Sequence, residues 1–241
     1  MDSEVQHLLY DDDSGKPIGL PEVQLLEPPP ADRMPRLRLL LAHGDEYVAY
    51  QAALILAAWG DKAGADYLEA LVERWPEGSK GFAPHRIYGY DNACDLIADA
   101  MDIYGTVSDD EQGAKRVFRK LLGIYGPTRF ESALQLLMLK PRYAELASDV
   151  ETATDKALLY NLPDAAGRLL PALAKWTGIR ALPVTRAVLS RGAGRDARLS
   201  VAEALQYVPG VESVAMLERL LEDEDNGVAD QAARSLAFLR A

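Results

Sequence analysis

Apolar residues recur along most of this chain with the spacing of an α-helix. The longest nearly apolar stretch is Tyr47–Trp59, in which Val48, Ala52 and Ile55 fall on one helical face. Asp45 precedes this stretch and is expected to cap its first turn. The stretch is too short to span a bilayer, so it predicts a buried helix of a folded domain. No convincing alternation of period two occurs, which favours an all-α fold.

The helical spacing continues to the end of the chain, and glycine, proline and capping residues interrupt it at short intervals. Helices are expected at Arg33–Ala42, Glu46–Trp59, Lys62–Trp75, Asn92–Tyr104, Asp110–Tyr125, Thr128–Lys140, Arg142–Tyr160, Pro163–Trp176, Val184–Ser190, Asp196–Val208, Val211–Glu222 and Val228–Arg240. Cys94 falls on the apolar face of its helix, so it is predicted to be a core residue rather than a nucleophile.

The segment 1–31 differs in composition from the rest of the chain. It contains five prolines and seven acidic residues. Because proline removes backbone donors and like charges repel, the sequence predicts an acidic, proline-rich N-terminal arm over this segment, extended or partly ordered. The short run Val23–Leu26 is a candidate for packing on the body. Residues 32–241 are predicted to form a single helical domain.

Three segments share one pattern of small residues followed by leucine. They are Ala52-Ala53 with Leu56, Val201-Ala202 with Leu205, and Ala232-Ala233 with Leu236, and each follows a polar capping region. The second and third segments are separated along the chain by the distance from Leu205 to Leu236. We call this spacing the repeat interval. Small side chains let helices approach closely, and the leucine fills the groove one turn later. The pairs Ala52-Ala53 and Ala232-Ala233 are therefore expected at close helix contacts.

These segments resemble the short bacterial form of the HEAT repeat, with the clearest match over residues 45–75 and 196–241. The resemblance implies an all-α, right-handed α-solenoid of stacked antiparallel helix pairs. Most proteins of this kind bind other proteins. A minority are DNA glycosylases, bilin lyases or their maturation factors, or inhibitors of toxins.

The formal charge of −11 bears on the choice of partner. An acidic surface repels nucleic-acid phosphates and suits a basic protein partner, although solubility alone also explains it. One cysteine excludes an intramolecular disulfide and multi-cysteine zinc sites. The three histidines, His7, His43 and His85, lack the spacing of a helix-borne zinc site. No metal, cofactor or catalytic motif is predicted. The N-terminus has no signal-peptide pattern, which favours a cytoplasmic protein.

The best candidate for a protein-binding surface is the loop before the helix at Asn92–Tyr104. The sequence gathers residue types that often anchor interfaces there. The predicted binding residues are His85, Arg86, Tyr88, Tyr90, Asp91, Asn92, Asp95 and Asp99. Packing of the two tyrosines against the helices is an equally good interpretation of the loop.

Three of these residues, Asp91, Asp95 and Asp99, recur at every fourth position and predict an acidic stripe on one helical face. A cation site or a docking surface for a basic partner would use such a stripe. A solvated polar face is the simpler interpretation, because apolar residues occupy the opposite side.

Together these features predict a non-catalytic, protein-binding α-solenoid. The more specific prediction is an immunity protein that binds and neutralises a basic bacterial toxin, with no nucleic acid or membrane as partner. The alternatives are a DNA glycosylase-type enzyme and a bilin lyase or maturation factor. Against the first alternative, no helix is dominated by lysine and arginine, as a phosphate-binding groove requires.

Overall fold

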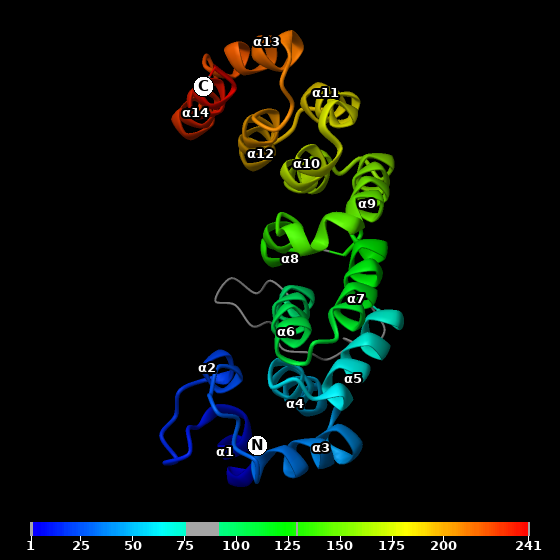
Figure 1. The fold of residues 1–241 in the computed structure, drawn as a ribbon, viewed down its shortest axis with the longest axis vertical. Coiled ribbons are helices and arrows are strands. Elements are labelled where there is room, and N and C mark those ends of the chain that lie inside the picture. The colour runs from blue at the N-terminus through cyan, green and yellow to red at the C-terminus, as the bar shows by residue number, and fades with distance from the viewer. Residues whose placement is uncertain (1, 76–91, 129, 241) are drawn as a thin grey trace. The chain divides into compact units, whose positions relative to one another are not determined.

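The computed structural model describes residues 2–75, 92–128 and 130–240, and over these residues the fold is all-α (Figure 1). Apart from two isolated bridges, Asp11 with Pro17 and Tyr125 with Thr128, these described residues contain no β pairing. The chain divides into two compact units, Met1–Leu121 and Leu122–Ala241. This division differs from the predicted arm and single domain. No helix in the described part of the chain is long and apolar enough to cross a membrane.

The first unit is built around one buried helix. Its helices are α1 (Ser3–Tyr10), α2 (Leu20–Gln24), α3 (Arg33–His43), α4 (Glu46–Ala58), α5 (Lys62–Glu73), α6 (Ala93–Val107) and the start of α7 (Glu111–Ile124). Helix α4 contacts α1, α2, α3, α5 and α6, and its residues from Ala49 to Ala58 are all buried. The predicted buried helix and its cap are confirmed, because the Val48 N–H donates to Asp45 Oδ1 at 2.9 Å.

The sequence predicted an extended or partly ordered arm over residues 1–31, with Val23–Leu26 as a candidate for packing on the body; the structure shows a folded segment in which Val23 does pack. It folds into α1 and α2, which pack on α4 and bury Leu9 and Val23 completely. Polar bonds also hold it in place. The Arg33 guanidinium, which is 3% exposed, donates to the Asp11 carbonyl at 2.8 Å, and Trp59 Nε1 donates to the Val23 carbonyl at 3.2 Å. Burial of these groups outweighs the proline content of the segment.

The second unit contains α8 (Ala133–Leu137), α9 (Ala147–Leu159), α10 (Pro163–Thr177), α11 (Leu182–Ser190), α12 (Arg195–Leu205), α13 (Val211–Leu220) and α14 (Asn226–Arg240), with 3₁₀ turns at Pro141–Leu146 and Gly178–Ala181. Helix α8 is much shorter than the predicted Thr128–Lys140. It begins only after Ser132, whose φ of −153° lies outside the helical region, and it ends at Leu137. Lys140 is extended before Pro141, with ψ of 135°, so no helix continues through this point.

Helices α10, α12 and α14 pack one on the next, and their buried positions recur at the repeat interval. Three sets of positions carry this recurrence: Ala166, Ala197 and Val228; Leu170, Val201 and Ala232; and Ala174, Leu205 and Leu236. At Gly167 a Cβ atom would lie 2.5 Å from the Ala197 Cβ, so glycine is required for this close approach. The repeat interval therefore has a counterpart in the core of this unit.

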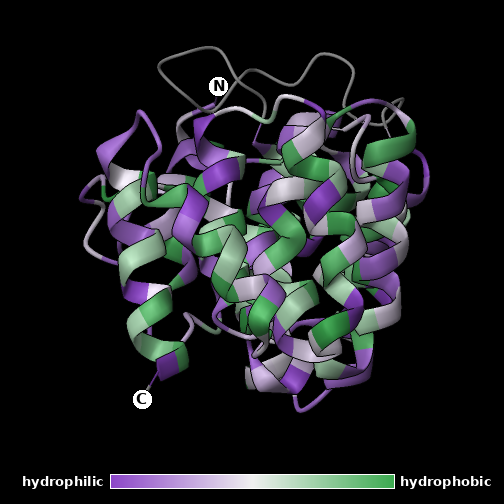
Figure 2. Cartoon of the chain, turned by 90° about the horizontal axis from the view of Figure 1, so that it is seen from above, coloured by the Kyte–Doolittle hydropathy of each residue, from purple (hydrophilic) through white to green (hydrophobic). Residues whose placement is uncertain are grey.

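The small pairs behave as predicted at three of four positions. Ala52, Ala53 and Ala232 are completely buried, and the Ala53 carbonyl lies 2.7 Å from where a Cβ of Gly64 would stand. Ala233 is exposed. Its side chain is turned about 100° from that of the buried Ala232, which places it on another face of α14. Figure 2 shows that hydrophobic and hydrophilic residues are mixed along the helices.

Candidate functional site

Most of the predicted binding loop cannot be placed. His85, Arg86, Tyr88, Tyr90 and Asp91 lie outside the described residues. Their contribution to a binding surface stays a prediction.

The described part of that surface differs from the expected acidic stripe. Asp99 is exposed, but Asp95 is only 4% exposed and Asn92 only 6%. Helix α6 is covered by α4 and α5, so both of its sides are largely buried at its N-terminal end. Asp95 therefore does not present its carboxylate to a partner. Cys94 is 2% exposed, which confirms it as a core residue.

A groove in the second unit gathers polar and apolar side chains that the sequence analysis did not single out. It lies among the segment around α8, helix α10 and helix α12, and has a volume of about 250 Å³. We call it the α8–α10–α12 groove. Its lining residues are Glu131, Ser132, Gln135, Leu136, Leu139, Arg168, Pro171, Asp196, Leu199, Ser200 and Glu203.

Helix α12 forms one wall of the groove. Asp196, Leu199, Ser200 and Glu203 line it and are spaced i, i+3, i+4 and i+7, which places them on one face of the helix. Val201 lies on the opposite face of α12, which packs in the core, and it is completely buried. The amphipathic pattern of α12 thus turns one face to the core and a mixed polar and apolar face to the groove.

Hydrogen bonds from α10 fix the wall opposite. Its side chains reach carbonyl groups on either side of α8: Arg168 Nη1 donates to Phe130 O at 2.9 Å, Lys175 Nζ to Leu139 O at 2.9 Å, and Trp176 Nε1 to Met138 O at 2.7 Å. Two of these bonds satisfy carbonyls just beyond the end of α8, where helical partners are missing. The walls of the groove are therefore fixed by bonds within the unit itself.

Gln135 is a nearly buried polar residue beside this groove. Gln135 is 7% exposed and its Nε2 donates to the Glu131 carbonyl at 3.0 Å, which fixes the orientation of the amide. Its Oε1 is buried without a hydrogen-bond partner. A buried acceptor without a donor costs free energy, on the order of 1–3 kcal/mol.

The charge of the groove is negative. Among the described residues, Glu131, Asp196 and Glu203 line it together with one base, Arg168. Burial raises the pKa of the Glu203 carboxyl above its ordinary value, because the protein replaces part of the water around it. Asp196 is also an ion-pair partner of Arg195, at 3.3 Å.

This local acidity stands out within its unit. Residues 1–121 carry 22 acidic and 12 basic residues, a formal charge of −10, whereas residues 122–241 carry 15 and 14, a formal charge of −1. The excess of carboxylates in the groove is therefore not a consequence of a generally acidic second unit.

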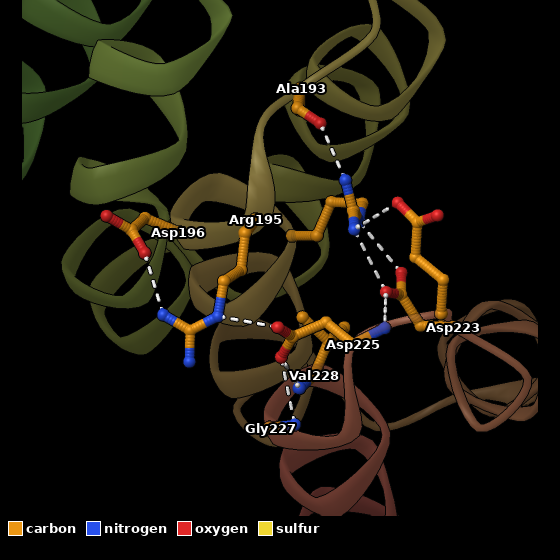
Figure 3. A network of polar contacts seen from close by, with 9 residues as sticks. Ala193, Arg195, Asp196, Asp223, Asp225, Gly227 and Val228 are labelled. Atoms are coloured by element: carbon orange, nitrogen blue, oxygen red, sulfur yellow. Dashed lines mark hydrogen bonds and ion pairs between the residues drawn. The ribbon is translucent and has the colours of Figure 1, made fainter.

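A network of ion pairs joins α12 to the turn before α14 at the rim of the groove (Figure 3). Arg195 bridges Asp196 and Asp225, and the Val228 N–H donates to Asp225 Oδ1 at 3.2 Å, so Asp225 caps α14. Arg198 holds Asp223 through two bonds of 2.8 and 3.0 Å. The hydrogen bonds from Arg198 hold the pKa of the Asp223 carboxyl below its usual range. The network positions α12, and with it one wall of the groove.

Other cavities of the second unit are less suited to a specific ligand. One lies at the α9–α10 turn, with a volume of about 390 Å³, and one between α11 and α13, with about 480 Å³. In the latter, Arg186 and Glu212 already pair with each other at 2.5 Å. Among the described residues, no cluster of three or more histidine, cysteine or carboxylate side chains is placed to hold a metal ion.

The groove was missed in the sequence because three separate segments build it. The row Asp196, Leu199, Ser200 and Glu203 is visible as one polar and apolar helical face. Nothing in the sequence shows that α8 and this row line one groove, since that depends on how α8 and α12 pack against α10. Comparison with known proteins gives no further guide, because no family model, curated protein or solved structure matches the chain.

Proposed function

We propose that this chain is a non-catalytic binding protein whose partner is a protein with a basic surface. The α8–α10–α12 groove carries this proposal, because it combines an excess of carboxylates and apolar side chains in one preformed hollow. Leu136, which is 62% exposed, adds an apolar contact at its rim. Interfaces commonly combine apolar contacts of this kind with a few placed polar groups.

The negative charge of the first unit also supports the proposal of a basic partner. A formal charge of −10 over residues 1–121 attracts a basic partner over distances of about 10 Å at 0.1 M salt. Such attraction mainly raises the association rate. The groove would then provide short-range contacts that slow dissociation.

The proposed architecture is a right-handed α-solenoid of HEAT-like repeats. The recurrence of buried positions in α10, α12 and α14 at the repeat interval supports it. More specifically, we propose that the chain is an immunity protein that acts in the cytoplasm and neutralises a basic toxin, such as a nuclease, by covering its surface. The acidic charge supports this form, since a nuclease must itself carry basic residues to hold phosphates.

The test begins with recovery of the partner on the tagged chain, followed by purification of both proteins. We expect a complex of defined stoichiometry whose association rate falls as salt rises. Expression of the partner alone should arrest cell growth, and co-expression of this chain should restore it. A harmless partner would refute the toxin-inhibitor form only. Turnover of a small molecule by the purified chain, without any protein complex, would refute the binding function as a whole.

A further inference from the structure

Helices α10 and α12 use equivalent positions to contact the next helix of the second unit. The first of these positions lies at the start of each helix. Asp164 Oδ1 on α10 accepts the N–H of Gly194, the residue before α12, at 2.6 Å. One repeat interval after Asp164, Arg195 Nε on α12 donates to Oδ2 of Asp225, the residue before α14, at 2.8 Å. Both bonds therefore tie one helix to the beginning of the next.

Two further sets of positions lie on the same face. A Cβ atom on Gly167 of α10 would stand 2.5 Å from a side chain of α12. Its equivalent on α12, Arg198, reaches Asp223 in the turn before α14. One turn further along, Pro171 on α10 and Ala202 on α12 are equivalent and both buried. We call the face that carries these three positions the stacking face.

Helix α14 has the same face, and there it is open to solvent. Its equivalent positions, one repeat interval after those of α12, are Asn226, Ala229 and Ala233. Asn226 and Ala233 are exposed, and Ala229 is half-buried. Ala237 and Phe238 extend the exposed apolar surface by one turn, and Phe238 is 62% exposed.

We propose that the stacking face of α14 binds a second copy of this chain, with the two α14 helices antiparallel about a two-fold axis. This contact continues the packing that joins α10 to α12 and α12 to α14. Ala229, Ala233 and Ala237 recur at every fourth position, and small side chains let two helices approach closely. The described residues that line the α8–α10–α12 groove belong to other helices, so this inference is independent of the proposed function.

The charges on the exposed side of α14 fit a second copy. Asp230 and Arg234 are both exposed and lie one turn apart. Arg234 donates to Gln231 Oε1 of its own helix, at 3.1 and 2.7 Å, which holds the guanidinium at the surface of α14. Antiparallel apposition places Asp230 of each copy opposite Arg234 of the other, so two ion pairs form. A partner surface of a single charge would be attracted by one of these side chains and repelled by the other.

The net charge of the second unit also permits self-association. Residues 122–241 carry a formal charge of −1, so two copies that meet through α14 approach with little repulsion. The formal charge of −10 over residues 1–121 would oppose a contact between two first units.

The first test measures the mass of the intact chain by analytical ultracentrifugation over a series of concentrations. We expect a monomer–dimer equilibrium with a dissociation constant in the micromolar range. Ala233→Glu places a charge in the apolar contact and should weaken the dimer at least about tenfold. Val211→Glu is the matched control, because Val211 is 88% exposed on α13 and outside the stacking face. It should leave the dissociation constant unchanged.

The second test reverses the two charges. Asp230→Arg and Arg234→Asp, made singly, each place like charges opposite one another twice and should weaken the dimer at least about tenfold. The double variant restores opposite charges and should recover most of the affinity. An equimolar mixture of the two single variants should form a heterodimer, because each then meets the opposite charge. Circular dichroism checks that every variant keeps the helix content of the parent chain.

A monomeric mass at every concentration up to the millimolar range would overturn the proposal. So would a dimer that Ala233→Glu leaves unchanged. If Ala233→Glu loses helix content, the charge variants decide. Failure of both the double variant and the mixture to recover the dimer would then contradict the antiparallel contact.

Discussion

The Arg198–Asp223 pair is expected to be worth more than an ordinary surface ion pair. Arg198 reaches both carboxylate oxygens, with Nε to Oδ2 at 2.8 Å and Nη2 to Oδ1 at 3.0 Å. The Asp223 side chain is 8% exposed and that of Arg198 is 22% exposed. Arg198→Met keeps the aliphatic stem, removes both bonds and leaves a nearly buried carboxylate without its cation.

The size of the effect follows from this geometry. Exposed ion pairs contribute about 0–1 kcal/mol, and breaking a fully buried pair costs about 3–5 kcal/mol. Because Asp223 is nearly buried and Arg198 is partly solvated, Arg198→Met should lower the free energy of unfolding by about 2–3 kcal/mol. Glu224 also contacts Arg198, at 3.4 Å, but its side chain is 88% exposed. Glu224→Ala should therefore change stability by less than about 0.5 kcal/mol.

The assay is urea denaturation followed by circular dichroism, applied to Arg198→Met, Asp223→Ala and the double variant. Their coupling energy should be about 1.5–3 kcal/mol at pH 7. Since the folded pKa of Asp223 is lowered, the contribution is complete above the unfolded pKa of about 3.9 and is lost as pH falls through the folded value. A coupling energy below about 0.5 kcal/mol at pH 7, or one unchanged at the lowest pH that permits folding, would refute the reasoning.

Three further predictions concern single positions. Asp45→Ala removes the cap of α4 and should lower the free energy of unfolding by about 0.5–2 kcal/mol in the same assay. Ala232→Phe should cost about 1–3 kcal/mol by overpacking, whereas Ala233→Phe, at the exposed neighbour, should cost less than about 0.5 kcal/mol; equal melting temperatures would contradict this packing. The folded pKa of Glu203 is raised, so ionisation of its carboxyl lowers stability as pH rises from about 4.3 through the folded value. Glu203→Gln should therefore raise the melting temperature at pH 7. This gain should disappear below about pH 4, where the carboxyl of the parent chain is protonated. A lower melting temperature of this variant at pH 7 would show that the carboxylate stabilises the fold.

Local sequence rules predicted the helices well where their signals were complete. Asp45 has the side chain and the spacing for an N-cap, and α4 begins directly after it, at Glu46. Helices α10 to α14 lie close to their expected positions, because each begins at a glycine, a proline or a capping residue and carries one apolar face. Helix α9 begins at Ala147, after a 3₁₀ turn, and not at the expected Arg142. The all-α class follows from the same pattern.

Tertiary packing explains what the sequence did not predict. The prolines of residues 1–31 indicated an extended arm, but Leu9, Val23 and the buried Arg33 guanidinium find partners on the first unit that no local rule supplies. Asp95 follows a spacing that suggests an exposed stripe, and its burial depends on the position of α4 and α5 beside α6. Likewise, the α8–α10–α12 groove depends on how α8 and α12 pack against α10.

Site-specific cross-linking tests the central claim most directly. A photoreactive p-benzoylphenylalanine replaces Leu199 in the groove or, as a control, Val211, which is 88% exposed on α13. Each chain is irradiated with the purified partner, and the linked peptides are sequenced. A groove that anchors a basic partner predicts a cross-link from position 199 to a peptide containing arginine or lysine, and none from position 211. A cross-link from position 211 with none from position 199 would contradict the account.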